Sequence, residues 1–239
     1  MSAFCVVSSL LPDDALSFLK KNYRVVALPP DDSLPEPIRC HPDSIFTVIG
    51  EELILPAAYY EAYPDPAHKI ASLGGFRLTL SHAERGSVYP LDAALNAAVG
   101  HDFLLCRPDS AATEILLAAQ RYGYTLIPVR QGYAGCACLI TDHAVLTGDP
   151  GIAKVLEDHR IPYRLFSNEG ILLPGYSCGF FGGACGFYGG TLYICGDYAA
   201  LPCSRALIEF ADESGFTILS ISGCDVTDVG GIRFLECKH

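Results

Sequence analysis

One pattern of hydrophobic and polar positions recurs five times along the chain. In each copy, apolar residues return at three- and four-residue steps, as Ile115, Leu116 and Ala119 do, and a short run of β-branched and aromatic residues follows. Pro, Asp or Ser stands where each helix would begin, which suits a cap and a first turn. The sequence therefore predicts a helix leading into a strand within residues 11–28, 56–80, 107–129, 148–166 and 196–221.

Four of these helices are preceded by a predicted pair of strands. Each pair contains a hairpin-like break where Gly or Asp supplies the turn, namely Gly50-Glu51, Gly100-His101, Asp142-His143 and Gly189-Gly190. The first helix has no such pair before it, but the chain ends in DVGGIRFLEC (228–237), a predicted strand with no helix after it. We expect the two ends to complete a fifth strand-strand-helix-strand unit and to close a ring.

Such units resemble those of the pentein superfamily, the α/β-propellers of the guanidino-group-modifying enzymes, and in particular an uncharacterised bacterial branch of it. The likeness is carried by HPDSIFTVIG (41–50), YPLDAALNAAVG (89–100), QGYAGCACLITDHAVLTGDPGIAKVLE (131–157), GFFGGACG (179–186) with GD at 196–197, and DVGGI (228–232). The resemblance implies an α/β fold, a five-fold pseudo-symmetric propeller of ββαβ units closed by the N- and C-terminal segments. It also implies a single domain over residues 1–239.

The resemblance further predicts where a site would lie, because in penteins the first strand of each unit runs near the pseudo-fivefold axis. The residues at the starts of these strands line a central funnel, so we expect the following to converge: His41, Asp43, Tyr89, Asp92, Asn96, Gln131, Cys136 and the segment 179–186. The longer segment GFFGGACGFYGG (179–190) has neither the Lys of a phosphate-binding loop nor the glycine order of a dinucleotide loop. We interpret its glycines as a means of close packing near the axis, with direct ligand contact as the alternative.

Catalytic members of this superfamily use a Cys nucleophile in the C-terminal strand, together with a His and acidic residues that grip the guanidinium. By the spacing that the resemblance implies, the nucleophile's position falls on Phe234. Cys237 comes three residues later, and an odd offset would turn it to the opposite face of a strand. The usual His would fall in 179–186, which contains none. Hydrolysis by the ordinary pentein mechanism is therefore not supported.

Other thiols remain candidates for a nucleophile. Cys136, predicted to begin an inner strand, or Cys185 would need a nearby His or cation to stabilise a thiolate. His41 could act as the base, since imidazole titrates near neutral pH. Each residue also has a structural interpretation: a buried thiol can be inert packing, and His41-Pro42-Asp43 can be a turn in which Asp43 caps backbone N–H groups.

Carboxylates suggest the kind of ligand that the funnel would take. Asp43, Asp92 and Asp228 together would make it negatively charged and attractive to a guanidinium or an amine, because carboxylates accept paired hydrogen bonds from such cations. Asp92 and Asn96 are four residues apart, a spacing that places both on one side of either a helix or a strand. The predicted binding residues are these four with Tyr89 and Gln131, although the carboxylates could instead satisfy backbone donors at turns.

The composition limits the classes of partner that the protein is expected to bind. The net charge of -11 and the scattered basic residues argue against nucleic acid, and the chain shows neither a signal peptide nor a membrane span. Eleven cysteines in a chain with half its residues hydrophobic favour reduced thiols in a cytoplasmic protein. The pairs Cys136-x-Cys138 and Cys178 with Cys185 lack the C-x-x-C spacing of structural zinc sites, so no metal and no cofactor is expected. The sequence does not decide whether the protein is a homo-oligomer.

Three functions are consistent with these patterns. The first is a protein whose central acidic funnel binds a small guanidino or amine compound without proven catalysis. The second is a Cys-dependent hydrolase or amidinotransferase acting on guanidino substrates, in which Cys136 or Cys185 works with His41. The third is a non-catalytic protein-interaction module, because fold alone does not decide function.

Overall fold

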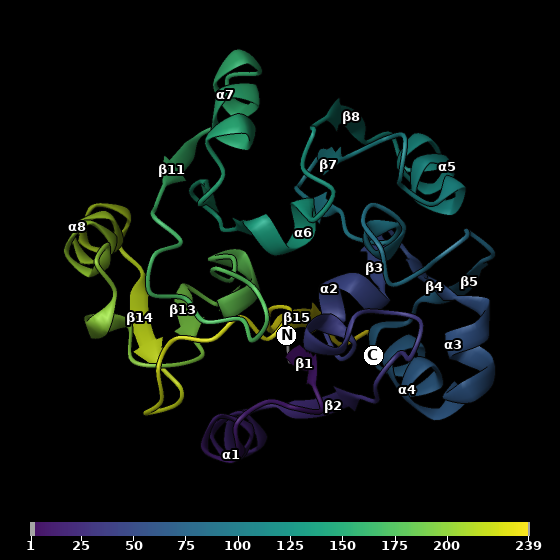
Figure 1. Ribbon diagram of the computed structural model, residues 1–239, viewed down its shortest axis with the longest axis horizontal. Coiled ribbons are helices and arrows are strands. Elements are labelled where there is room, and N and C mark those ends of the chain that lie inside the picture. The colour runs from purple at the N-terminus through teal and green to yellow at the C-terminus, as the bar shows by residue number, and fades with distance from the viewer. Residues whose placement is uncertain (1–2, 239) are drawn as a thin grey trace.

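The computed structural model describes residues 3–238 as five small sheets arranged around a common centre, with the longer helices on the outside (Figure 1). Every sheet has three strands in the same arrangement: an inner strand pairs antiparallel with a middle strand, and the middle strand pairs parallel with an outer strand. A helix joins the middle strand to the outer strand, as a parallel connection requires. The repeat predicted from the hydrophobic pattern is confirmed.

Four units follow one another along the chain. Their inner strands are β3 (Thr47–Ile49), β6 (Ala98–Val99), β9 (Cys138–Ile140) and β12 (Cys185–Tyr188). Their middle strands are β4 (Glu52–Pro56), β7 (Phe103–Cys106), β10 (Val145–Thr147) and β13 (Thr191–Ile194). The outer strands are β5 (Arg77–Ser81), β8 (Thr125–Pro128), β11 (Tyr163–Leu165) and β14 (Thr217–Ser220). The connecting helices are α3 (Ala57–Ala62) with α4 (Pro64–Gly74), α5 (Thr113–Arg121), α7 (Pro150–Asp158), and α8 (Ser204–Ser214), which follows the short 3-10 helix η4 (Tyr198–Ala200).

The two ends of the chain build the fifth unit. Strand β15 (Arg233–Glu236) is its inner strand and pairs antiparallel with β1 (Ala3–Ser8), with Phe234 opposite Cys5. Helix α1 (Asp13–Asn22) then leads to the outer strand β2 (Arg24–Leu28), which runs parallel to β1. The predicted completion of a fifth unit by the two terminal segments is therefore confirmed.

Packing between neighbouring units makes the core. Leu139 and Leu146 from the sheet of β9 and β10 lie in one apolar cluster with Leu192 and Ile194 from the sheet of β12 and β13. Burial of such side chains stabilises each unit only while its neighbours are present, since a single three-stranded sheet has too little apolar surface of its own. No helix among residues 3–238 is long and apolar enough to cross a membrane.

A short segment precedes each inner strand and faces the centre of the ring. These segments are the one-turn helices α2 (Pro42–Ile45) and α6 (Ala134–Ala137), the 3-10 helices η2 (Leu91–Ala93) and η3 (Gly182–Ala184), and the loop 228–231. A further 3-10 helix, η1 (Glu36–Ile38), lies just before α2. Figure 1 shows α2 and α6 near the middle of the ring, where they pack together.

Segment α6 corrects one expectation from the sequence. Cys136 was expected to begin an inner strand, but it lies in the helical turn α6, and β9 begins only at Cys138. The turn sits so close to the neighbouring unit that a Cβ atom on Gly135 would lie 2.8 Å from the carbonyl oxygen of Ala97. Small residues permit this approach, and the turn carries the Cys136 thiol to the centre.

Candidate functional site

Three side chains from distant segments meet at the centre of the ring and form what we call the central triad: His41, Cys136 and Asp228. The Cys136 sulfur lies 3.6 Å from Oδ1 and 3.5 Å from Oδ2 of Asp228. His41 Nδ1 lies 3.7 Å from Asp228 Oδ1. One donor atom from each residue lies within 4.8 Å of the others, and all three residues are buried.

Backbone amides hold the Asp228 carboxylate in place. Phe180 N–H donates to Oδ2 at 2.8 Å, and Gly230 N–H donates to Oδ1 at 3.0 Å. Burial raises the pKa of Asp228 above its ordinary value, His41 lowers it and the nearby Asp43 carboxylate raises it, with a net increase. Asp228 is thus a fully buried acid whose charged form depends on what stands beside it.

Asn96 connects this carboxylate-rich centre to Cys136. Its Nδ2 atom lies 3.3 Å from Asp43 Oδ1 and 3.1 Å from Ser44 Oγ, and its Oδ1 accepts the backbone N–H of Cys136 at 3.1 Å. The Arg233 guanidinium stands 3.9 Å from Asp43 Oδ2, an atom with no hydrogen-bond partner among the described residues. Asp43 therefore pairs with side chains, and the structure does not show it capping backbone N–H groups.

The surroundings of Cys136 do not favour a thiolate. Burial raises the pKa of the Cys136 thiol well above its ordinary value, and the Asp228 and Asp43 carboxylates raise it further. The thiol is directed at a carboxylate, whereas an activated catalytic thiol has a cation beside it. Cys136 and His41 were candidates for a nucleophile and its base, and the structure places them close together.

Cys185 lies elsewhere, in the apolar core. It begins β12 opposite Ile194 and belongs to the cluster of Leu192 and Phe181. Burial raises the pKa of the Cys185 thiol well above its ordinary value. The neighbouring thiols of Cys195 and Cys203 and the Asp228 carboxylate raise it further, so the environment resembles that of an inert packing thiol.

Asp92 lies on one side of the centre and is held by an aromatic residue. Tyr133 donates its hydroxyl to Asp92 Oδ2, while Asp92 Oδ1 has no hydrogen-bond partner among residues 3–238. The Tyr133 ring lies between Phe180 and Tyr89, with centroids 6.2 Å and 5.6 Å away. Tyr89 itself is 43% exposed, and its hydroxyl accepts the Gly132 N–H at 3.1 Å. Tyr89 therefore lies at the protein surface and not in the buried centre.

Gln131 turns away from the triad. Its Nε2 donates to Asp149 Oδ2 at 3.1 Å, and its Oε1 accepts the Tyr133 N–H at 3.1 Å. Asp149 is the N-cap of α7 and also accepts the N–H groups of Gly151 and Ile152. The structure thus brings His41, Asp43, Asn96, Cys136 and Asp228 together, places Asp92 against Tyr133, and leaves Tyr89 and Gln131 outside.

The glycines of 179–186 make room for the triad. A Cβ atom on Gly183 would lie 2.1 Å from Asp228 Oδ1, and one on Gly179 would lie 2.4 Å from Asp228 Cβ. Real Cβ atoms do not approach other atoms so closely, so these positions require glycine for space. The packing interpretation of this segment agrees with the structure.

Phe234, where the resemblance placed the nucleophile, is part of an aromatic group. Its ring lies 5.0 Å from Tyr23, 4.9 Å from Tyr193 and 5.6 Å from Tyr188, measured between centroids. It offers no group able to attack a substrate. Cys237 packs, partly buried, against a different apolar cluster.

A pocket of about 450 Å³ reaches two members of the triad, His41 and Asp228. His41 and Asp228 line it together with Glu36, Leu173, Pro174 and Val229. A volume of this size suits a small molecule, and the lining combines apolar walls with two carboxylates and an imidazole. Sequence reasoning missed Glu36 and Leu173, since neither stands at the start of an inner strand.

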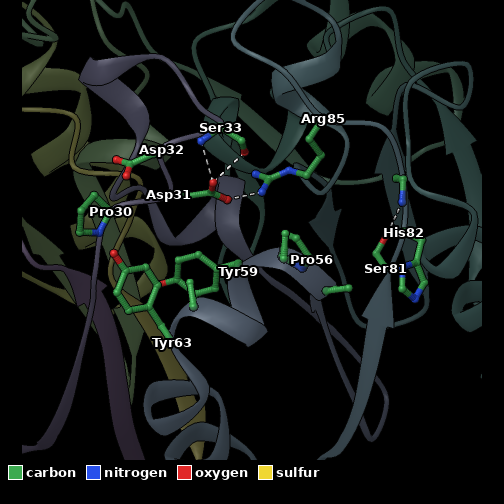
Figure 2. Close-up of a pocket in the computed structure, with 14 residues that line it drawn as sticks. Pro30, Asp31, Asp32, Ser33, Pro56, Tyr59, Tyr63, Ser81, His82 and Arg85 are labelled. Carbon is green, nitrogen blue, oxygen red and sulfur yellow. Dashed lines mark hydrogen bonds and ion pairs between the residues drawn. The ribbon is translucent and has the colours of Figure 1, made fainter.

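A second pocket, of about 500 Å³, lies at the edge of the ring between α3 and the loop before η1, and Figure 2 shows its lining. Asp31 and Arg85 point toward each other there and form an ion pair that is almost fully buried. Ser33 donates to Asp31 Oδ1 from its N–H at 3.0 Å and from its hydroxyl at 2.7 Å. The Asp31 carboxylate already has an ionic partner and two hydrogen-bond donors, so it is not available to pair with a charged ligand.

The arrangement of five ββαβ units is the pentein fold. Solved structures with the same fold include a variant of dimethylarginine dimethylaminohydrolase in an adduct with S-methyl-L-thiocitrulline (11% identity, TM-score 0.61, 98% of this chain and 99% of the other). DDAH from Pseudomonas aeruginosa in complex with citrulline is similar (9% identity, TM-score 0.57, 98% of both chains). So is inosamine-phosphate amidinotransferase from Streptomyces griseus (15% identity, TM-score 0.57, 94% of this chain and 78% of the other).

A narrower assignment comes from the sequence family. Residues 6–233 match the model of a family of unknown function, DUF6873, and the chain belongs to that family. No curated protein matches the sequence. The family description assigns no function, so the site has to be interpreted from its own residues.

Proposed function

We propose that the central site binds a small guanidino or amine compound, which enters through the pocket beside His41. The observation that carries this proposal is the lining of that pocket. Glu36 stands exposed at its mouth, Asp228 lies buried at its floor, and Leu173 and Val229 line its walls. A cationic group attached to a short apolar chain complements such a surface.

The charge balance of the centre supports a cationic ligand. Asp43 and Asp228 have fully buried side chains, and Arg233 is the cation near them, 3.9 Å from Asp43 Oδ2. His41 and the N–H groups of Phe180 and Gly230 favour the charged form of Asp228, yet burial still raises its pKa above the ordinary value. A guanidinium or ammonium group of a ligand beside Asp228 would stabilise the charged form further.

The names of the structural neighbours are consistent with this chemistry. They include enzymes of dimethylarginine, an arginine dihydrolase and an amidinotransferase. Each acts on a guanidino or amidino group according to its name, but the low sequence identity carries only the fold. We therefore extend to this protein the kind of ligand, and we assign it no reaction.

A second candidate function rests on one distance. Donor atoms of Cys136 and His41 lie within 4.8 Å of each other, so a Cys-dependent hydrolase or amidinotransferase with an altered arrangement remains a proposal. It requires that a bound substrate cation stabilise the Cys136 thiolate. Turnover of a guanidino compound that is lost in Cys136→Ala and kept in Cys185→Ala would support it.

The free thiols bear on the cellular compartment in which the protein works. All eleven cysteines are free in the structure, and five of them lie deep in the apolar core: Cys5, Cys106, Cys138, Cys185 and Cys195. Free thiols persist in reducing compartments. We therefore propose a cytoplasmic protein that meets a small cationic metabolite there.

Calorimetric titration with a panel of guanidino compounds and amines, in the presence of a chelator, tests the proposal. We expect binding of at least one cation, no binding of its neutral ureido analogue, and a loss of more than about tenfold in affinity for Asp228→Asn. Glu36→Gln should weaken binding by about threefold, because an exposed charge contributes less than about 1 kcal/mol. Glu61→Gln, the same change on an exposed face of α3, is the matched control. Equal affinity for charged and neutral analogues would exclude the proposal.

A further inference from the structure

We propose that His41, Cys136 and Asp228 form a binding site for a single transition-metal ion of the zinc class, with an open coordination position toward the pocket beside His41. The inference goes beyond the proposed function, because it rests on the donor atoms of the triad and not on the shape of the pocket. A thiolate, an imidazole and a carboxylate are the three ligand types that zinc takes in proteins. Three protein ligands with one free position are typical of zinc sites that do chemistry.

The spacing of the donor atoms fits one ion at their centre. Tetrahedral ligands at the usual zinc bond lengths, about 2.0–2.3 Å, lie roughly 3.3–3.7 Å from one another. The Cys136 sulfur is 3.6 Å and His41 Nδ1 is 3.7 Å from the same oxygen, Asp228 Oδ1. The His41 separation is too long for a direct hydrogen bond, whereas the Cys136 thiol is at the distance of an S–H···O hydrogen bond to Asp228. Both separations also match the separation of two ligands around one metal ion.

An unsatisfied imidazole nitrogen is the second, independent observation. The His41 side chain is only 5% exposed, and its Nδ1 has no hydrogen-bond partner among the described residues although it points at Asp228. Leaving a buried polar atom unpaired is unfavourable by about 1–3 kcal/mol. A metal ion at the centre of the triad would satisfy this nitrogen, the thiol sulfur and the carboxylate oxygen at once.

Contacts around the triad are those that a metal site needs. The N–H groups of Phe180 and Gly230 fix the Asp228 carboxylate, and Asn96 fixes the backbone of Cys136. Such second contacts orient metal ligands and hold their geometry before the ion arrives. A Cβ atom on Gly230 would lie 2.3 Å from His41 Cβ, so glycine at that position lets the His41 ring sit against the loop.

Binding would change the protonation of the site. The ion coordinates the Cys136 sulfur as a thiolate, so the thiol proton leaves to solvent as the metal–sulfur bond forms. The net charge of one divalent cation, one thiolate and one carboxylate is zero, so the ion would compensate the buried negative charge of Asp228. Since a guanidinium would neutralise the same carboxylate, the two ligands should compete.

Cobalt(II) is the probe, because it replaces zinc and reports its ligands in the visible and near-ultraviolet spectrum. We expect the chelator-treated protein to bind one equivalent of Co²⁺ with a thiolate-to-cobalt charge-transfer band and strong tetrahedral visible bands. Cys136→Ser should lose the charge-transfer band. Cys138→Ser, a change to a buried thiol two residues away and outside the triad, should keep it.

Affinity and stability give two further readouts. His41→Gln should weaken Zn²⁺ binding by more than about 100-fold, since replacing even an outer contact of a metal ligand commonly weakens it 10–100-fold. Zn²⁺ should raise the melting temperature of the wild type and of Cys138→Ser but not of His41→Gln. A guanidino compound shown to bind by calorimetry should weaken Zn²⁺ binding.

The two proposals can fail separately. Absence of a charge-transfer band in folded wild-type protein, or its persistence in Cys136→Ser, overturns the metal site whatever the guanidino titration gives. If Cys136→Ser does not fold, the lack of a Zn²⁺-dependent shift in wild-type melting temperature decides against the site. Guanidino binding in the presence of chelator, combined with no Co²⁺ spectrum, would support the proposed function and refute the metal site.

Discussion

The side-chain oxygen of Asn96 accepts the backbone N–H of Cys136 at 3.1 Å, and this bond joins two units of the ring. Through the same side chain, Asn96 also reaches Asp43, at 3.3 Å from Nδ2 to Oδ1. One buried amide thereby fixes the backbone under the Cys136 thiol and one of the central carboxylates.

Replacement of Asn96 by alanine should destabilise the protein strongly. The change leaves the buried Cys136 N–H without its acceptor and leaves Asp43 Oδ1 with Ser44 Oγ as its donor. A buried polar group left unpaired is unfavourable by about 1–3 kcal/mol. We expect the free energy of unfolding to fall by roughly 2–4 kcal/mol in urea titrations. Asn22→Ala, at the exposed end of α1, should change it by less than about 0.5 kcal/mol. A loss of the same small size in Asn96→Ala would contradict the connecting role.

Gly183 tests the packing interpretation of the glycine-rich segment. An alanine there would place Cβ 2.1 Å from Asp228 Oδ1, so either the carboxylate or η3 must move. We expect a loss of roughly 2–3 kcal/mol in unfolding free energy, as for other overpacked cores. Gly223→Ala is the matched control, because nothing lies within 4 Å of its added Cβ. If both variants melt at the same temperature, space is not the reason for glycine at 183.

The cysteines should differ widely in their rate of alkylation in the presence of a chelator. Cys178 and Cys224 are exposed and should react first at pH 8, whereas Cys136, 4% exposed, should react only when the structure opens. Cys5 should be among the slowest, because burial raises its pKa to about 12. Peptide mass spectrometry after timed alkylation gives the rates. Labelling of Cys136 as fast as that of Cys178 would instead favour the Cys-dependent enzyme.

Glu52 should make the stability depend on acid pH. Burial raises the pKa of its carboxyl, but hydrogen bonds from Thr79, Arg121 and Arg77 lower it more, so the pKa lies below its ordinary value of 4.5. A lowered pKa in the folded state contributes stability that is present above about pH 4.5 and is lost as the pH falls through the folded-state value.

The comparison of wild type with Glu52→Gln measures this contribution. We expect the variant to be less stable at pH 7 by roughly 1–3 kcal/mol, and the difference to shrink between pH 5 and pH 3. Glu61→Gln, on an exposed face of α3, should differ little from wild type throughout. A difference that stays constant or grows with acid would show that Glu52 is not a stabilising charged partner in the folded state.

The repeat, the hairpin turns and the pairing of the two ends followed from the sequence. Apolar spacing marks α5 around Ile115 and Ala119, and Gly50 marks the turn between β3 and β4. The terminal strand lacked a helix after it, and β15 pairs with β1 as that imbalance predicted. The helices and turns are decided by residues close together in the chain, which is where hydrophobic periodicity and turn chemistry act. The pairing of the two ends followed instead from the count of elements in the repeat.

The content of the site was decided by the tertiary structure. The prediction that Cys136 begins an inner strand was wrong, because Cys136 lies in the helical turn α6, where Gly135 packs closely on Ala97. Gln131 was expected at the centre, but a partner nearby in the chain, Asp149, holds it away. Spacing along the sequence could not reveal that Cys136 and Asp228, 92 residues apart, would share a buried centre with His41. These three side chains come from three different units and meet only after the units have packed, because that packing fixes the distances between the side chains.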